Sequence, residues 1–186
     1  MKYAVMFERD GVLNRVRVLA RQQMVPLAVS DFHVNEEAVE PLTHLRSAGY
    51  LMLAVTNQPG ISHGSLSRRE LDMMHGVLRN RLPLDDILVC PHDESDRCSC
   101  RKPRTGLLIE AAFKWQLDLD RCFVVSDKWQ DAAAAQVAGC TSILIQSQWN
   151  GGGHHDFIVP SLADAVEKIL QLQVPDHAYA AHRRVA

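Results

Sequence analysis

Polar side chains that could bind a phosphate group and a metal ion come directly after three short apolar runs of the chain. They are Glu8 with Asp10, Thr56 with Asn57, and Ser126 with Asp127. Carboxylates two positions apart on extended chain point to the same side, so the first pair can converge on one cation if the chain turns at Gly11. Magnesium prefers one or two carboxylates together with water and phosphate oxygens, and Asp127 suits that role. These residues predict a magnesium-assisted phosphate site.

Two cations, Arg101 and Lys102, precede a segment with a helical pattern. Lys102 offers a point charge to a phosphate group, and Arg101 offers a bidentate fork. Pro103 suits the first position of the helix that follows. Asp131 lies one helical turn after Asp127 and is expected either to support the site or to cap a helix.

Each of these features also has an ordinary structural explanation. The acidic pair at positions 8 and 10 would be a solvated strand end, and Asn57 would cap a turn. The two cations would be a surface charge pair. Their order along the chain, each cluster following a separate strand candidate, favours a common site over these separate explanations.

The five cysteines fall into two groups. Cys90-Pro91-His92 and Cys98-Ser99-Cys100 are separated by five residues. Soft ligands at this spacing predict a structural Zn²⁺ site, with reduced thiols that bind no metal as the alternative. Its four ligands would be Cys90, His92, Cys98 and Cys100. The loop runs directly into Arg101, so the metal would fix the two cations in place. Cys122 and Cys140 are expected to be buried thiols.

The elements that must position these residues alternate along the chain. Buried strands are predicted at 3–7, 51–55, 87–90, 122–125 and 142–145. Helices are predicted at 37–47, 67–78, 106–115, 130–137 and 162–172, and Ser67 and Glu70 predict a capping box. This alternation is typical of an α/β fold with a parallel sheet covered on both faces. Such folds bind ligands at the carboxyl ends of the strands, where the polar residues fall.

Length and composition narrow the functional class. The length suits one domain over residues 1–172, and the weakly periodic tail, 173–186, is expected to be poorly ordered. A formal net charge of −2 leaves no basic excess for nucleic acid, which argues against a zinc-ribbon nucleic-acid protein. No apolar run approaches the roughly 18 residues of a membrane span, so we expect a cytoplasmic protein without membrane contact. The histidines are expected mostly at the surface.

Four short boxes, taken together, resemble the haloacid dehalogenase (HAD) superfamily of phosphatases. They are Glu8–Gly11, Thr56–Gln58, Arg101–Pro103 and Ser126–Lys128. They are most similar to the group of D-glycero-D-manno-heptose 1,7-bisphosphate and histidinol-phosphate phosphatases, over roughly residues 3–147. The resemblance implies a three-layer Rossmannoid fold with a parallel central sheet, no separate cap domain and a short zinc-binding loop.

The resemblance also implies catalytic and metal-binding roles. Glu8 would attack phosphorus and form an acyl phosphate. Asp10 would protonate the leaving alcohol and then activate water. Mg²⁺ would be held by the carboxylates of Glu8 and Asp127 and by the backbone carbonyl of Asp10. The expected activity is Mg²⁺-dependent hydrolysis of a small sugar phosphate or amino-alcohol phosphate.

Further residues would bind the substrate by the same resemblance. Thr56, Asn57 and Lys102 would hold the phosphate that is transferred, and Arg101 would contact the rest of the substrate. Phosphoryl transfer depends mostly on positioning and on charge stabilisation, and these residue types supply both. A small phosphorylated metabolite is therefore the expected partner.

Position 8 is the main departure from the group, which has Asp where this chain has Glu. Ser126 stands in place of Gly, and Pro59 stands where a small residue is usual. A misplacement of about 1 Å in a reacting group can cost roughly 10²-fold in rate. Three explanations stay open: a Glu nucleophile in an adjusted backbone, a pseudophosphatase that binds a phosphorylated ligand, and an engineered substitution.

Overall fold

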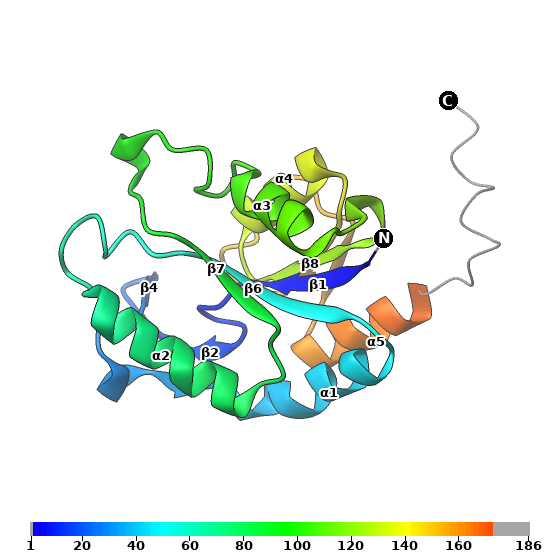
Figure 1. The fold of residues 1–186 in the computed structure, drawn as a ribbon, viewed down its shortest axis with the longest axis horizontal. Helices are drawn as coiled ribbons and strands as arrows, with labels where there is room; N and C mark the ends of the chain where they lie inside the picture. Colours follow the sequence, from blue (N-terminus) through cyan, green and yellow to red (C-terminus); the bar gives the residue numbers. More distant parts are fainter. Residues whose placement is uncertain (1, 173–186) are drawn as a thin grey trace.

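The computed structural model describes residues 2–172, so the predicted tail at 173–186 lies outside the described residues. A parallel six-stranded sheet runs through the centre in the order β10-β9-β8-β1-β6-β7 (Figure 1). Its strands are β1 (Ala4–Phe7), β6 (Leu51–Asn57), β7 (Asp86–Cys90), β8 (Phe123–Ser126), β9 (Thr141–Ile145) and β10 (Phe157–Val159). The predicted parallel sheet is confirmed.

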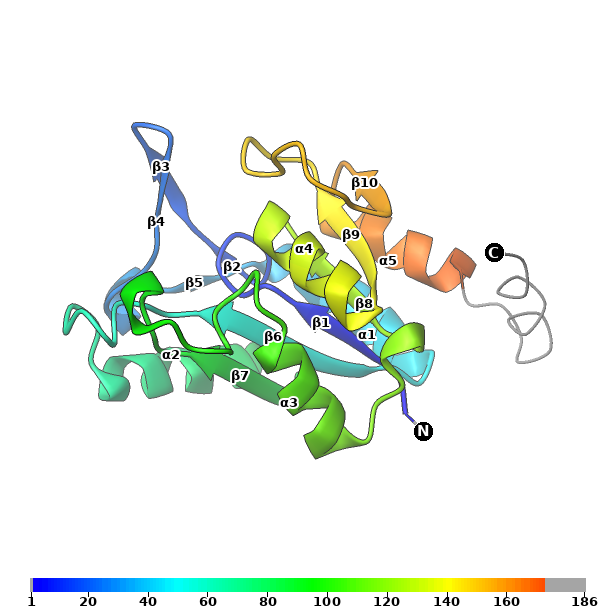
Figure 2. The same cartoon turned by 90° about the horizontal axis from the view of Figure 1, so that it is seen from above.

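Helices cover both faces of this sheet, which gives three layers (Figures 1 and 2). They are α1 (Val39–Ser47), α2 (Arg68–Arg81), α3 (Gly106–Trp115), α4 (Trp129–Ala138) and α5 (Leu162–Leu172). Alternate side chains of β1 point to opposite faces. Val5 and Phe7 pack in one core cluster with α1, α2 and α5, whereas Ala4 and Met6 pack in the other with α3 and α4.

The start of α2 confirms one half of the predicted capping box. The Ser67 hydroxyl accepts a hydrogen bond from the backbone N–H of Glu70 at 3.1 Å. The Glu70 carboxylate does not return to Ser67; it accepts from the backbone N–H of Val29 at 2.7 Å. The prediction of a complete box is therefore wrong, because this carboxylate ties α2 to the short 3₁₀ helix η1 (Val29–Asp31) instead.

Several short elements were not predicted. The strands β2 (Asn14–Arg15) and β5 (His33–Val34) pair with each other, and β3 (Arg17–Leu19) and β4 (Gln22–Met24) form a hairpin. Figure 2 shows this hairpin projecting from the body of the molecule. The side chains of β3 are all exposed, so the hairpin has no alternation of apolar and polar residues to reveal it. Three further 3₁₀ turns are η2 (Glu36–Ala38), η3 (Glu94–Asp96) and η4 (Leu119–Arg121).

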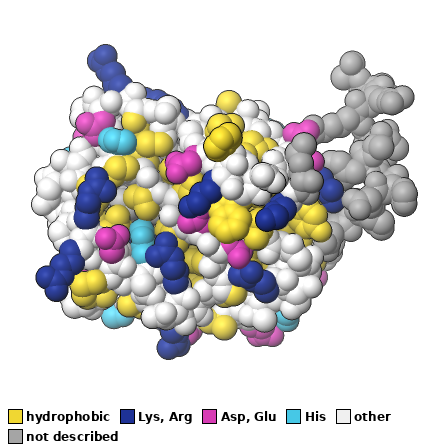
Figure 3. Space-filling model, viewed as in Figure 1, with side chains coloured by type: hydrophobic (Ala, Val, Ile, Leu, Met, Phe, Trp, Pro, Cys, Tyr) yellow, Lys and Arg dark blue, Asp and Glu magenta, His cyan; other side chains and the backbone are white. Residues whose placement is uncertain are grey.

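Two predictions about single residues have different outcomes. Cys122 and Cys140 are buried, as expected. Pro103 does not begin the helix that follows it, because α3 starts at Gly106 and Pro103 lies in the preceding turn. Within residues 2–172, no helix has the length and apolar character needed to cross a bilayer. On the face seen in Figure 3, basic and acidic side chains are interspersed.

Candidate active site and metal loop

A pocket of about 580 Å³ opens at the carboxyl ends of β1 and β6. Charged and amide side chains from widely separated segments line it. They include Glu8, Asp10, Gln23, Asn57, Glu94, Arg101, Lys102, Lys128, Gln130 and Asp131. Most of the residues predicted from the sequence therefore meet at one place, the edge of the sheet where an α/β fold binds its ligands.

The side chain of Glu8 lines the pocket and is buried. Its Oε1 accepts hydrogen bonds from the backbone N–H groups of Arg9 at 2.8 Å and Asp10 at 3.2 Å, and from the Thr56 hydroxyl at 3.0 Å. Its Oε2 accepts from the ammonium group of Lys102. A single carboxylate thus receives hydrogen bonds from four groups that converge from three segments of the chain.

Lys102 joins the two buried carboxylates of the site. Its Nζ donates to Glu8, to Asp131 Oδ1 at 2.5 Å and to the carbonyl of Val55 at 2.8 Å. Burial alone would raise the pKa of Glu8, but the charges of Lys102 and Lys128 lower it to about 2. Burial raises the pKa of Asp131 to about 6, even though Lys102 opposes this shift. Asp131 therefore supports the site through Lys102 and does not cap α4.

Asn57 and Arg101 hold the loop around Lys102. The Asn57 amide accepts from the backbone N–H of Lys102 and donates to its carbonyl, both at 3.2 Å. This side chain thus anchors the Lys102 backbone at the pocket wall. Arg101 donates to the carbonyl of His92 at 3.2 Å and pairs with Glu94 at 3.3 Å. Arg101 therefore stands at the pocket rim, where the remainder of a substrate could reach it.

The carboxylate of Asp10 is held by three donors. The Arg9 guanidinium binds both oxygens, at 3.0 and 2.9 Å. Asn14 donates to Oδ1 at 3.1 Å and Gln58 donates to Oδ2 at 2.7 Å. No role was predicted for these three donors, although Arg9 and Gln58 lie inside the boxes.

Arg9 is itself fully buried and contacts a histidine. Its second terminal nitrogen lies 3.3 Å from His75 Nε2 on α2, and its guanidinium carbon lies 5.5 Å from the ring centre of Phe32. Since arginine can only donate, His75 accepts with a neutral ring. Burial, together with the charges of Arg9 and Arg79, lowers the pKa of His75 to about 3. His75 is an exception to the expected surface position of the histidines.

The carboxylate of Asp127 and the backbone of Asp10 bind the same cation, the ammonium group of Lys128. The Lys128 ammonium donates to the carbonyl of Asp10 at 2.5 Å and to Asp127 Oδ1 at 2.8 Å. Gln23 of the hairpin donates to Asp127 Oδ2 at 2.6 Å. A Cβ at Gly11 would lie 2.6 Å from the same oxygen, so only glycine permits this approach. Two oxygen atoms, the carbonyl of Asp10 and Asp127 Oδ1, thus bind one cationic group, and oxygen is the ligand type that Mg²⁺ prefers.

The carboxylates of Glu8, Asp10 and Asp127 point to different partners. Across residues 2–172, Glu8, Asp10 and Asp127 do not form a group whose ligand atoms all lie within 4.8 Å of one another. Glu8 is turned to Lys102, and Asp10 is turned to Arg9. The backbone carbonyl of Asp10 and the carboxylate of Asp127 are the pair that shares a cation, through Lys128.

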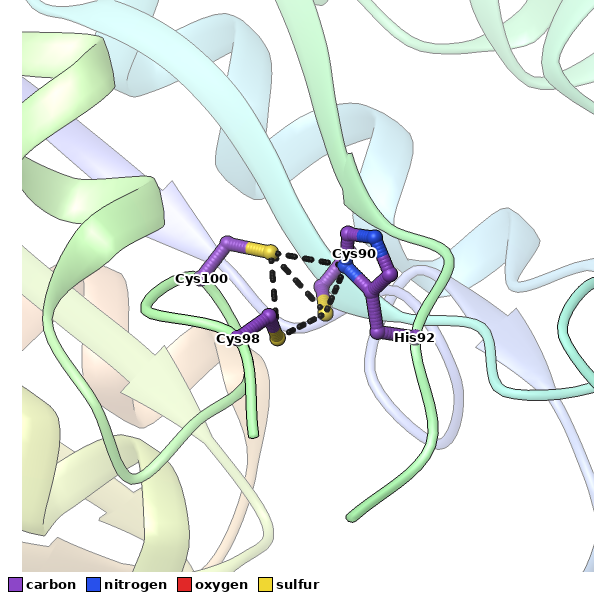
Figure 4. Close-up of side chains that lie close together, drawn as sticks. All are labelled: Cys90, His92, Cys98 and Cys100. Atoms are coloured by element: carbon purple, nitrogen blue, oxygen red, sulfur yellow. Dashed lines mark hydrogen bonds between the residues drawn. The ribbon is translucent and has the colours of Figure 1, made fainter. Parts of the chain in front are cut away.

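The cysteine loop brings its four predicted ligands together (Figure 4). The donor atoms of Cys90, His92, Cys98 and Cys100 all lie within 4.8 Å of one another. The three sulfur atoms are 3.2 to 3.6 Å apart, and His92 Nδ1 is 3.2 Å from the sulfur of Cys100. Four ligands at bond lengths of about 2.0–2.3 Å from one ion would have comparable separations. The donor set and its geometry therefore fit a metal ion with four protein ligands.

Fold and site together define a class. A parallel sheet with an acidic pair after β1, a hydroxyl after β6, a lysine before α3 and an aspartate after β8 is the arrangement of a HAD-like hydrolase. The HAD-hydrolase-like family model matches residues 99–165.

Two curated relatives extend the match over most of the chain. The D-glycero-beta-D-manno-heptose-1,7-bisphosphate 7-phosphatase of Haemophilus ducreyi is 32% identical over 187 residues, which cover 89% of this chain and 97% of the relative. The protein of the same name from Helicobacter pylori strain J99 is 31% identical over 151 residues, covering 78% of this chain and 83% of the relative. The chain belongs to this family of HAD phosphatases.

Solved structures agree with that placement. The D,D-heptose 1,7-bisphosphate phosphatase of B. bronchiseptica, in complex with magnesium and phosphate, superposes with a TM-score of 0.79 at 28% identity. The alignment covers 92% of this chain and 99% of that structure. The enzyme of the same kind from Burkholderia thailandensis has a TM-score of 0.66 at 20% identity over 91% of this chain and 99% of that structure, which supports the fold alone.

Proposed function

We propose that the protein is a magnesium-dependent phosphatase of a small sugar phosphate, of the heptose bisphosphate kind. The relatives of known name are phosphatases of that substrate. They lend no support to the alternative of a pseudophosphatase. The residues at 1–172 would act as one phosphatase domain. The cytoplasmic location remains a prediction.

One observation carries the proposal: four hydrogen-bond donors converge on the carboxylate at position 8. The Lys102 ammonium, the Thr56 hydroxyl and the N–H groups of Arg9 and Asp10 all meet there. Donors fixed in place around a reacting centre stabilise the charge of a phosphoryl group as it is transferred. This array therefore supports phosphoryl transfer to the carboxylate that it surrounds.

The mechanism uses the carboxylates on either side of Arg9. An oxygen of Glu8 attacks phosphorus, the bond from phosphorus to the sugar oxygen breaks, and an acyl phosphate forms on Glu8. Asp10 takes part in the first step in its protonated form and gives that proton to the leaving oxygen; the carboxylate that results then takes a proton from the water that hydrolyses the acyl phosphate, which restores the protonated form. Arg9, Asn14 and Gln58 orient Asp10 for both steps.

Two metals fit the residues present. Glu8, Asp127 and the carbonyl of Asp10 would hold Mg²⁺, which supplies charge neutralisation to the phosphate when bound. The cysteine loop would hold Zn²⁺ with all four positions filled by protein, so its role would be structural. Because the loop continues into Arg101 and Lys102, a bound zinc ion would fix the phosphate-binding lysine.

The direct test is phosphate release from a panel of substrates. Purified protein with Mg²⁺ would be incubated with heptose 1,7-bisphosphate, fructose 1,6-bisphosphate, histidinol phosphate and p-nitrophenyl phosphate. We expect the highest kcat/KM with the heptose bisphosphate. Phosphorus NMR of the product would identify the phosphate removed, and we expect loss of the one at carbon 7.

A matched variant supplies the background for that assay. Lys102→Ala removes the ammonium group that binds Glu8 and should reduce release to a few per mille of the native rate, given the roughly 10²–10³-fold effect of a single fixed donor. The proposed function fails if the native protein, with its folding verified by circular dichroism, releases no more phosphate than this variant on every substrate.

A further inference from the structure

The groups that donate hydrogen bonds to Glu8 have no N–H or O–H proton left for another partner. The N–H groups of Arg9 and Asp10 and the Thr56 hydroxyl each carry one proton, and each is given to Glu8. The Lys102 ammonium carries three protons. They go to Glu8, Asp131 and the carbonyl of Val55. We call these four groups the phosphate cradle.

The length of the side chain at position 8 explains how one residue can reach all of these donors. Glu places its carboxylate one carbon–carbon bond, roughly 1.5 Å, further from the backbone than Asp does. At this reach Oε1 accepts from two N–H groups and a hydroxyl while Oε2 accepts from Lys102. Its burial shows that no solvent layer separates it from them.

We propose that the Glu8 carboxylate is an internal ligand of the phosphate cradle, which an incoming phosphate group must displace before it can bind. The inference rests on the proposed function, since it takes the cradle to be the phosphate site. Displacement breaks a buried ion pair and several charge-assisted hydrogen bonds, so a phosphate group alone binds weakly. The site therefore favours substrates that add contacts elsewhere in the pocket, such as to Arg101, and releases inorganic phosphate readily.

Calorimetric titration of the full chain with inorganic phosphate tests this without turnover. The buffer contains no magnesium, so the part that Glu8 would play as a metal ligand does not enter. The informative variants are Glu8→Asp, which keeps the charge and shortens the side chain, and Glu8→Ala, which removes both. We expect both variants to bind phosphate at least about tenfold more tightly than the native protein, since each frees several charge-assisted hydrogen bonds.

The two variants distinguish two causes of weak phosphate binding: the hydrogen bonds of Glu8 to the cradle, and repulsion between the charge of Glu8 and the phosphate. If negative charge at position 8 were the whole cause, only Glu8→Ala would bind phosphate more tightly. Glu8→Asp with native affinity therefore overturns the inference, and that variant also covers the case in which Glu8→Ala fails to fold. Glu110→Ala removes the same charge from the exposed face of α3 and should leave the affinity within about twofold, because a distant surface charge is screened.

A double variant identifies where the phosphate binds. Adding Lys102→Met to Glu8→Asp should abolish the gain in affinity, and a gain that persists overturns the inference by placing the phosphate elsewhere. The outcomes also separate the two proposals. If the native protein hydrolyses sugar phosphates but Glu8→Asp binds phosphate no better, only the inference fails. If neither hydrolysis nor phosphate binding is found in any form, both fail.

Discussion

The phosphate cradle and the cysteine loop lie on either side of one short segment, Cys100-Arg101-Lys102, yet they are held in opposite ways. In the cradle, the Lys102 ammonium lies between the carboxylates of Glu8 and Asp131. In the cysteine loop, the ligand atoms of Cys90, His92, Cys98 and Cys100 contact one another. The cradle contains its own counter-charges, whereas the loop brings together four side chains of the types that bind metal ions.

The ionisation of the thiols makes the contrast sharper. Burial raises the pKa of Cys90 to about 12, whereas hydrogen bonds from Cys100 and Cys90 outweigh burial and lower the pKa of Cys98 to about 7. Metal binding requires the thiols to lose their protons, and a cation bound by the loop would let the three of them ionise together. The four ligand types of the loop therefore suit a bound metal ion as the group that would hold them together, whereas the cradle is held by the ammonium group of Lys102.

The largest effect is expected from Lys102→Met. Loss of the ammonium group should lower kcat/KM by about 10³-fold, since a fixed donor to the transferring phosphate is lost. It also leaves Glu8 and Asp131 buried without a counter-charge, so the free energy of unfolding should fall by about 3–5 kcal/mol. Steady-state kinetics and urea denaturation measure the two effects.

The matched control is Lys114→Met, which breaks a lysine–carboxylate pair at the surface. Lys114 lies 2.7 Å from Asp86, and its side chain is 56% exposed. The median exposed pair contributes about 0–1 kcal/mol, so this change should cost little. Equal losses of stability in the two variants would show that the cradle is not held by its internal charges.

The second effect is expected from Cys100→Ala, which removes a metal ligand directly before the cations. Bound zinc, measured by atomic absorption, should fall from about one per chain to well below one. Activity should fall by about 10–100-fold, the usual range when the surroundings of a metal or site are disturbed. Cys140→Ala is the control, because it removes a buried thiol outside the loop and should keep the zinc. Full activity in a zinc-free Cys100→Ala protein would contradict the dependence of Lys102 on the loop.

The sequence predicts the positions of the site better than the directions of its side chains. Thr56, Lys102 and the cysteine loop are found where their place after strands or before a helix puts them, because parallel strands end at one edge of the sheet. Asn57 lines the pocket, and nothing in the sequence indicated that its amide would also bind the Lys102 backbone. A spacing along the chain identifies the segment that a residue follows and leaves its rotamer open.

Contacts between distant segments could not be predicted in this way. His75 lies 66 positions from Arg9, and Gln23 lies 104 positions from Asp127. Neither belongs to a local motif, and the hairpin that carries Gln23 has no apolar pattern. Arg9 is the residue from which such a contact could have been expected. It lies between two site carboxylates, and a charged residue that is buried there requires a partner.

A smaller effect, on the pH dependence of stability, is expected from His75, which accepts a hydrogen bond from Arg9. The pKa of His75 is about 3 in the native state, against about 6.5 when unfolded. Between these values the unfolded state binds a proton that the native state excludes. The contribution of His75 to the free energy of unfolding is therefore fully present above pH 6.5 and is lost as the pH drops toward 3.

Replacing the titrating ring should remove this loss. Between pH 7 and pH 5 the native protein should lose about 2 kcal/mol more than His75→Gln, whose amide oxygen can still accept from Arg9. Urea denaturation at the two pH values measures the difference. His44→Gln, on the exposed side of α1, should keep the native pH dependence. If it loses the dependence as well, or if His75→Gln retains it, the acid sensitivity arises elsewhere.

The smallest effect should come from the hairpin, which reaches the site from outside. Gln23→Ala removes the donor to Asp127 Oδ2 but leaves the Lys128 bond on the other oxygen. One hydrogen bond to a charged group contributes about 1.5–3 kcal/mol at most, and water can replace this donor at a half-exposed position. We expect a rise in KM of about two- to fivefold with kcat little changed. Gln22→Ala, its neighbour on β4, should leave both constants as they are. A large fall in kcat for Gln23→Ala would mean that the cradle and its metal site are not complete without the hairpin.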